Sequence, residues 1–297
     1  MNPLGPIIAA TDFSAPARHA ADRAARLAHE TGAALSLMHV LPGSALKELR
    51  QWLGTGHAME QQLHDDARRQ LCALASELQL HRHVTPRTIN ASGSVPDEIN
   101  EQAEALDAAL LVLGARGAGF LRRLVLGSTS ERMLHRTARP LLVVRQTPHE
   151  RYRRALVALD FSPWSGHAVA LARQVAPHAR LVLFNAFEVP FEGKLHFARV
   201  EATTIDHYRR QARNHATLQL HALASACRLK AGDWEPCIVE GDAAQRIIEY
   251  EQEKDCDLVV LGKHGLSATE DLLLGSVSKH VLDEGSTDVL VSTARVA

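Results

Sequence analysis

The sequence lacks several features that would each assign it to a particular class of protein. Its 33 Lys and Arg residues almost balance 34 Asp and Glu residues, giving a formal net charge of −1. Without a basic excess, the usual electrostatic footprint of a nucleic-acid-binding protein is missing, although a local basic patch is compatible with this balance. No apolar run approaches the roughly 20 residues that cross a bilayer. The N-terminus has neither the basic region nor the apolar core of a signal peptide. We therefore expect a soluble, cytoplasmic protein that binds neither nucleic acid nor membrane.

Cysteine and metal-ligand patterns are equally sparse. The four cysteines form no C-x-x-C pair; they are Cys72, Cys227, Cys237 and Cys256. Because zinc-ribbon spacing and a secretion signal are both absent, we expect reduced thiols that pack as small apolar side chains. The 17 histidines are dispersed, and the neighbouring pairs His81/His83 and His215/His221 have no carboxylate or cysteine beside them at ligand spacing. The sequence predicts no structural metal site.

The sequence does contain an internal repeat of long period. The segment Ala-Ala-Thr-Asp-Phe-Ser at 9–14 returns as Ala-Leu-Asp-Phe-Ser at 158–162, so that Asp12 and Asp160 lie 148 positions apart. A period of this length indicates a duplicated domain rather than a solenoid. The same offset separates further matching residues, namely Gly93 and Gly241, Gly114 and Gly262, Gly117 and Gly265, Gly127 and Gly275, and Ser128 and Ser276.

The junction between the two copies is a short polar segment. Residues 146–150 read Gln-Thr-Pro-His-Glu, and a polar stretch with proline is typical of a linker. We therefore expect a first domain at residues 1–147 and a second at 148–297. These are called the first and the second half below.

Each half alternates short apolar runs with helical segments. An apolar run that is too short for a helix and bounded by turn residues predicts a buried strand. Strands that alternate with helices predict a doubly wound α/β domain, with a parallel sheet covered on both faces. The expected strands are 7–11, 35–40, 84–89, 109–113 and 141–144 in the first half, and 156–159, 181–184, 237–239, 258–261 and 289–291 in the second.

A glycine pattern stands at the same place in both halves. Gly114-Ala-Arg-Gly117 is followed by nine residues and then by Gly127-Ser128, and the second half repeats this spacing from Gly262. The first glycine follows an apolar strand and the last one opens a helix. Glycine lets the backbone approach a ligand closely, and the N–H groups at a helix N-terminus suit phosphate. In an open parallel sheet, such a loop and Asp12 both lie beyond the carboxyl ends of the strands, where ligands bind.

The alternative interpretation is that these glycines only form turns and helix caps. Their recurrence at equal offsets, in the same strand–loop–helix context, argues against it. Other nucleotide motifs are missing: the chain has neither G-x-x-x-x-G-K-[ST] nor G-x-G-x-x-G. A P-loop NTPase and a Rossmann dehydrogenase are therefore disfavoured.

The pattern G-x-x-G, nine residues, G-[ST] resembles the ATP-binding group of the universal stress proteins, the UspA family. The resemblance includes the strand that ends at Asp12, His39-Val40 at the end of the second strand, and the closing segment 139–144. It covers nearly the whole chain in two copies, so the sequence is identified as a tandem member. It implies two adenine nucleotide alpha hydrolase-like domains, each a five-stranded parallel sheet of order 3-2-1-4-5. Family dimers pair their last strands, so we expect an intramolecular pseudo-dimer, with a further homodimer open.

The resemblance also implies roles for individual residues. Asp12 would accept a hydrogen bond from the adenine amino group, and the backbone of Val40 would contact the base. The glycines and hydroxyls would hold ribose and phosphates, and Arg116 is either a phosphate contact or a solvated surface charge. The candidate set is Asp12, Val40, Gly114, Arg116, Gly117, Gly127, Ser128, Thr129 and Ser130 in the first half, and Asp160, Ala186, Gly262, Gly265, Gly275, Ser276 and Ser278 in the second.

The sequence contains no arrangement typical of a strong catalytic centre. Neither a Ser-His-Asp pattern at strand ends nor H-E-x-x-H is present, and no paired acids are tied to the glycine loops. The absence of these motifs gives no ground for a catalytic role. The resemblance implies a regulatory or stress-response module that binds ATP, or else ADP or AMP, with magnesium carried in on the nucleotide. Two alternatives stay open: a nucleotide-free interaction protein, and a slow ATP hydrolase or phosphotransferase.

The two glycine loops differ in charge, which predicts different affinities. With histidine neutral, the first loop is +3 and the second is +1 −2 = −1. The residues counted are Arg116, Arg122 and Arg123 against Lys263, His264, Glu270 and Asp271. Each exposed contact with a phosphate is worth at most about 1 kcal/mol, so ATP should bind about tenfold more tightly in the first half. Val277 stands where the first half has Thr129, which removes one hydroxyl and acts in the same direction.

Calorimetry on Asp12→Ala and Asp160→Ala, each leaving one adenine pocket intact, measures the two affinities separately. The difference should shrink as salt is raised, because exposed charges are screened over about 8–10 Å. Equal affinities would show that the loop charges do not act on the phosphates.

Overall fold

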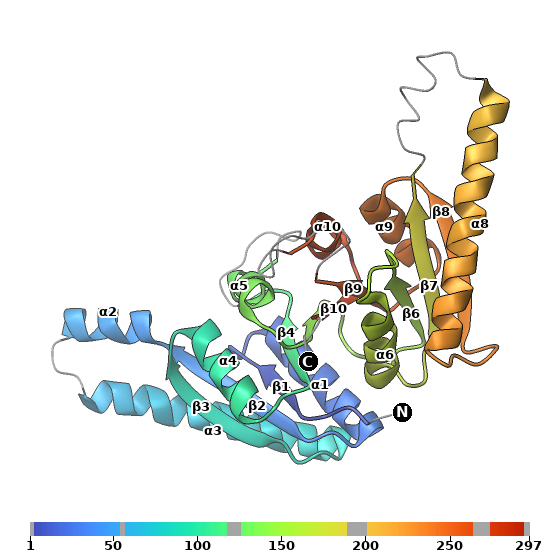
Figure 1. The fold of residues 1–297 in the computed structure, drawn as a ribbon. Coiled ribbons are helices and arrows are strands. Elements are labelled where there is room, and N and C mark those ends of the chain that lie inside the picture. The colour runs from blue at the N-terminus through green and yellow to red at the C-terminus, as the bar shows by residue number, and fades with distance from the viewer. Residues whose placement is uncertain (1–2, 54–56, 118–125, 189–200, 264–273, 294–297) are drawn as a thin grey trace.

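A computed structural model describes residues 3–53, 57–117, 126–188, 201–263 and 274–293, in which strands and helices alternate (Figure 1). The first half contains β1 (Ile7–Ala10), α1 (Ala15–Thr31), β2 (Leu35–Pro42), α2 (Gly43–Leu53), α3 (His57–Arg82), β3 (Arg87–Gly93), α4 (Val95–Ala105), β4 (Leu110–Gly114), α5 (Ser128–Arg136) and β5 (Leu141–Val144). The second contains β6 (Arg154–Ala158), α6 (Ser165–Val175), β7 (Arg180–Phe187), α8 (Ala202–Ala226), β8 (Trp234–Glu240), α9 (Ala243–Glu253), β9 (Leu258–Gly262), α10 (Ser276–Glu284) and β10 (Asp288–Ser292).

The strands form one sheet of ten, in the order β3-β2-β1-β4-β5-β10-β9-β6-β7-β8. Each half thus has the predicted order 3-2-1-4-5, and the pairs within each half are parallel. The halves meet at β5 and β10, which pair antiparallel with Leu142 opposite Leu290. The α/β fold and the expected pairing of the last strands are confirmed, and the antiparallel pair makes the sheet mixed.

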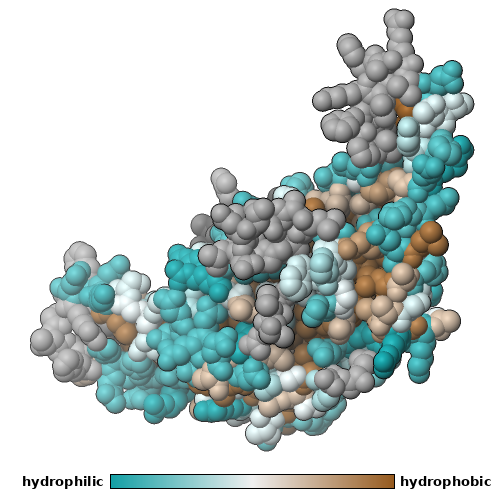
Figure 2. All heavy atoms as spheres, in the orientation of Figure 1, coloured by the Kyte–Doolittle hydropathy of each residue, from teal (hydrophilic) through white to brown (hydrophobic). Residues whose placement is uncertain are grey.

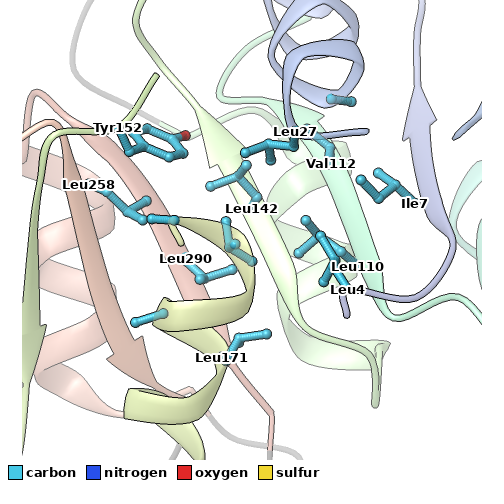
Figure 3. Close-up of a cluster of buried hydrophobic side chains, with 14 of the residues drawn as sticks. Leu4, Ile7, Leu27, Leu110, Val112, Leu142, Tyr152, Leu171, Leu258 and Leu290 are labelled. Atoms are coloured by element: carbon cyan, nitrogen blue, oxygen red, sulfur yellow. The ribbon is translucent and has the colours of Figure 1, made fainter. Parts of the chain in front are cut away.

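Helices cover both faces of this sheet (Figure 1). α1, α3, α6 and α8 pack on one face and α4, α5, α9 and α10 on the other, and each face buries one continuous apolar cluster. Both clusters run across the β5–β10 junction. Leu142 and Leu290 belong to the first cluster and Val143 and Val289 to the second, and Figure 3 shows the two leucines facing the same core. Burying a side chain of this size stabilises the fold by about 1.5–3 kcal/mol.

The third strand lies elsewhere than predicted. It was expected at 84–89, but β3 spans Arg87–Gly93 because α3 continues to Arg82 and Pro86 has no N–H for a sheet. β3 is an edge strand whose residues are all half-buried or exposed, so it lacks the apolar run that marks the central strands.

The surface is polar over much of the molecule. Figure 2 shows a largely hydrophilic face over the arm formed by α2, α3 and α4, with more hydrophobic atoms towards the middle and the second half. Within the described part of the chain, none of the helices combines the length and the apolar character that a bilayer-spanning segment needs.

All four cysteines are unpaired, as expected. Cys256 is buried, and desolvation raises the pKa of its thiol to about 12. Burial also raises the pKa of Cys227 and of Cys237. The expectation that every cysteine packs as an apolar side chain is wrong for Cys72, because this residue lies on the exposed side of α3.

A buried polar network joins the two halves beside the β5–β10 pair. Asp288 is fully buried; its Oδ2 accepts from the Tyr152 hydroxyl at 2.7 Å and lies 3.2 Å from Nε of Arg23 on α1. Its Oδ1 accepts from the backbone N–H groups of Arg145 (2.8 Å) and Gln146 (3.0 Å). The Arg23 guanidinium also lies 4.1 Å from the centre of the Tyr152 ring. Burial, helped by Asp288, raises the pKa of Tyr152 well above its usual value, so the phenol remains a donor.

We predict that Asp288→Ala lowers the free energy of unfolding by about 3–5 kcal/mol, because it leaves the Arg23 cation buried without its carboxylate. Chemical denaturation of the full chain measures this. Asp97→Ala is the matched control: it breaks an ion pair with Arg136 in which the two side chains are 62% and 56% exposed, and should cost less than about 1 kcal/mol. Equal stability of the two variants would show that the network adds nothing to the fold.

Candidate functional site

A pocket of about 370 Å³ lies at the carboxyl ends of β1, β2 and β4. This volume is in the range of small-molecule sites, roughly 300–1,000 Å³. All nine candidate residues of the first half line it: Asp12, Val40, Gly114, Arg116, Gly117, Gly127, Ser128, Thr129 and Ser130. Residues far apart in the sequence are thus brought to one cavity.

The two ends of the pocket differ in chemistry. One wall is apolar and comes from β2, β4 and α4. The other end is formed by Arg116, the glycine loop and the first residues of α5, whose N–H groups have no partner within the helix. The apolar lining residues were not among the predicted site residues, although the alternation along β2 could have indicated two of them; they are Ala10, Ala17, Met38, Pro42, Val95, Ile99 and Leu113.

Asp12 is exposed directly after β1, where the chain turns into α1. Its Oδ1 accepts from the backbone N–H of Ser14 at 3.1 Å, and the Ser14 hydroxyl in turn accepts from the N–H of Ala17 and caps the helix. Phe13 between them has φ of 64°. The second half has the same turn, in which Asp160 accepts from the N–H of Ser162 at 2.9 Å. Both aspartates are therefore fixed by the start of the following helix.

His39 is a lining residue whose structural role the sequence did not reveal. It is buried on β2, its Nδ1 donates to the carbonyl of Thr11 at 2.7 Å, and its ring stacks on Phe13 with centroids 4.4 Å apart. The matching residue of the second half is Asn185, whose Nδ2 donates to the carbonyl of Leu159 at 2.8 Å. The sequence could have indicated this role, because His39 and Asn185 stand at equivalent positions of the two halves and both carry a side-chain donor.

Two glycines of the loop, Gly114 and Gly117, leave no room for a side chain, and each adjoins a different neighbour. A Cβ on Gly114 would lie 2.8 Å from the carbonyl oxygen of Pro16, in the first turn of α1. A Cβ on Gly117 would lie 2.7 Å from Oδ2 of Asp12, at the pocket itself. Gly114 therefore allows the helix to pack against the strand end, and Gly117 leaves room for the Asp12 carboxylate.

The serines at the start of α5 and α10 fall into two kinds. The hydroxyl of buried Ser130 donates to the carbonyl of Gly114 at 2.8 Å, and Ser278 does the same to Gly262 at 2.7 Å. Their hydroxyl protons thus tie each helix to the preceding strand. Ser128 and Thr129 also line the pocket and are less buried.

The second half places its candidates in the same way. Asp160 follows β6, Ala186 lies on β7, Gly262 ends β9, and Gly275, Ser276 and Ser278 begin α10. Gly265 lies outside the described residues, as do Arg122, Arg123, His264, Glu270 and Asp271 of the two loops. A pocket of about 530 Å³ between α9 and α10 includes Ser276 but none of the other candidates that the structure describes.

One prediction about the second loop is wrong. Lys263 was counted as a positive charge available to phosphates, but its side chain is buried and points to the first half. Its Nζ donates to the carbonyl of Thr137 at 3.0 Å and to that of His135 at 3.4 Å, at the C-terminal end of α5. A helix C-terminus carries partial negative charge, which attracts this cation.

Metal ligation receives no support from the described side chains. Among them, no group of three or more His, Cys, Asp or Glu residues is arranged to hold a metal ion.

The strand order, the turn at Asp12 and the glycine loop together define a class of doubly wound α/β domain, here present twice. The sequence pattern of the Universal stress protein family matches residues 4–145 and again residues 151–293. The chain belongs to this family.

Known relatives agree with a tandem arrangement. A universal stress protein of Mycolicibacterium smegmatis is 27% identical over 97% of this chain and 97% of its own length. Universal stress protein G of Shigella flexneri is 35% identical over 40% of this chain and 82% of its own length. The crystal structure of a universal stress protein from Archaeoglobus fulgidus, 17% identical, aligns with a TM-score of 0.69 over 97% of this chain and 98% of that one. The last likeness shows the fold.

We predict that Gly114→Ala lowers the free energy of unfolding by about 1–3 kcal/mol, because the new methyl group meets the backbone of α1. Thermal or chemical unfolding measures the change. Gly166→Ala in α6 is the control, since its Cβ would lie no closer than 4.0 Å to any neighbour; alanine in a helix is favoured over glycine, so this variant should be as stable as the parent or slightly more stable. A fully stable Gly114→Ala protein would contradict the packing role.

Proposed function

We propose that this universal stress protein binds ATP, or else ADP or AMP, in the first-half pocket and acts as a cytoplasmic regulatory or stress-response module. The observation that carries the proposal is the convergence of all nine candidate residues on one pocket with an apolar wall and a helix N-terminus. Such a pocket suits a ligand with a flat apolar base at one end and an anionic chain at the other. In this proposal the chain consists of two domains, 1–147 and 148–297.

In the proposed complex, the base lies against the apolar wall from β2 and α4. Asp12 accepts from the exocyclic amino group, because its Oδ2 is directed to the pocket side, near Gly117. The backbone of Val40 contacts the base edge. A carboxylate is an acceptor only, so it favours adenine, which presents an amino donor at that position.

The phosphates lie at the start of α5. The unpaired N–H groups of its first turn, the hydroxyls of Ser128 and Thr129, and Arg116 provide donors and positive charge. Gly127 begins the helix and is held by its own N–H, which donates to the carbonyl of Ala115 at 2.8 Å. A magnesium ion would be carried in by the nucleotide and bind its phosphates.

The second half has the same turn, glycines and helix start, and we propose a weaker site there. Val277 replaces a hydroxyl, and the cation of Lys263 is directed away. The larger Phe184 also stands in place of Met38, with its ring centroid 5.6 Å from that of Tyr250.

Calorimetric titration of the full chain with ATP, ADP and AMP tests the proposal, together with native mass spectrometry of the freshly purified protein. We expect Asp12→Ala to weaken binding at the first site by tenfold or more, which corresponds to about 1.4 kcal/mol. Asp66→Ala, which removes an exposed carboxylate paired with Arg69 on α3, is the control and should bind as the parent does. A parent chain that binds none of the three nucleotides would contradict the proposal.

We further predict that His39→Leu weakens ATP binding by about tenfold, because it removes the donor that holds the Thr11 carbonyl next to Asp12. His39→Asn should stay within about threefold of the parent, since Asn185 makes the equivalent bond in the second half. Both variants are titrated in the Asp160→Ala chain, so that only the first site is observed. Equal losses in the two variants would mean that the imidazole itself, and not its hydrogen bond, is required.

A further inference from the structure

Lys263 lies at the start of the glycine loop of the second half, and its main chain is part of that loop. Its N–H donates to the carbonyl of Ser292 at 2.9 Å, and its carbonyl accepts from the N–H of Gly275 at 3.0 Å. Gly275 is the residue from which α10 begins. The backbone of Lys263 therefore fixes the position of the second-half helix start relative to β9 and β10.

The side chain of the same residue acts in the other half. Nζ contacts the carbonyls of His135 and Thr137 at the C-terminal end of α5, and the residue is only 5% exposed. The opposite end of this nine-residue helix is the wall of the first pocket, where Ser128 and Thr129 begin it. A cation held against the last carbonyls is favourable for the helix dipole, most of all when partly buried.

The residue that matches Lys263 in the first half does not make this contact, although Arg145 of the first half donates to the carbonyl of Leu282 near the C-terminal end of α10. At the matching position stands Ala115, which makes the same two backbone bonds, from its N–H to Val144 and from Gly127 to its carbonyl, each at 2.8 Å. Its methyl group cannot reach α10. The lysine is therefore not needed to build a glycine loop, and what it adds is the contact with the other half.

A second bond joins the halves at the same place. The hydroxyl of Thr293, just after β10, donates to the carbonyl of Ala138 at 2.8 Å. The segment that follows α5 is thus held from the second half by both Lys263 and Thr293. The C-terminal end of α5 is therefore held by second-half residues in addition to contacts within its own half, such as the ion pair of Arg136 with Asp97.

We infer that Lys263, contributed by the second half, is a positioning residue for the first nucleotide site. It holds the C-terminal end of α5 and thereby sets where the N-terminal end of that helix meets the phosphates. The inference rests on the proposed function. It implies that the ligand affinity of the first site depends on a residue that does not line it. Loss of the Lys263 side chain should therefore weaken the binding of the phosphates and leave the binding of the base unchanged.

The test compares Lys263→Met with Lys279→Met, which removes an exposed lysine from α10. Both are made in the Asp160→Ala chain, where the first site alone is read, and are titrated with ATP and with adenosine. We expect Lys263→Met to weaken ATP binding by roughly three- to tenfold, the size expected from a partly buried cation at a helix end, and to leave adenosine binding unchanged. Lys279→Met should change neither.

The outcomes separate this inference from the proposed function. If the Asp160→Ala chain itself binds no ATP, the proposed function fails. If it binds ATP and Lys263→Met leaves that affinity unchanged, or weakens ATP and adenosine equally, the proposed function stands and the positioning role of Lys263 is wrong.

Discussion

The antiparallel pairing of β5 with β10 is the contact on which the rest of the structure depends. Each half alone would end in a short strand of buried residues with one edge unpaired, and an apolar strand with an open edge is prone to association. Pairing the two strands closes both edges at once and turns two sheets into one. Because Leu142 and Leu290 face one side and Val143 and Val289 the other, it also merges the cores on both faces.

The junction follows an approximate two-fold arrangement in its strands and in their paired leucines and valines, but not in the polar network around Asp288. Arg23, Tyr152 and Asp288 form the charged network, and the repeat aligns them with Leu171, Leu4 and Pro140, which are 148 positions away. Leu4 and Leu171 are buried in the same apolar cluster as Tyr152, as Figure 3 shows. One side of the junction is therefore built with an ion pair and the other with leucines. Buried ion pairs and well-packed apolar groups can be close in stability, which explains how both solutions fit one fold.

The sequence predicted what the two halves share and missed what they do not. Strands β4 and β5 lie within a residue of their expected positions, because both faces are buried and the apolar run is continuous. The edge strand β3 was misplaced, because its half-exposed residues give no such signal. The candidate residues that gather in the first pocket were recognised from motif spacing. The roles of Lys263 and Asp288 were not, because each lies opposite an unlike residue in the other copy and makes its contacts at a distance of more than 120 positions.

The two candidate sites illustrate how a duplicated fold can diverge without changing its frame. The turn at the aspartate, the serine that ties helix to strand, and the donor from the second strand are the same in both halves, and all involve backbone groups. The differences lie in side chains that leave this frame intact: Phe184 for Met38, Val277 for Thr129, and Lys263 for Ala115. The first two lie at the proposed second site. The third is different, because the side chain of Lys263 is directed to the C-terminal end of α5 in the first half. Under the positioning role that we infer for Lys263, a change in one copy alters the site of the other, because the two sheets are joined into one.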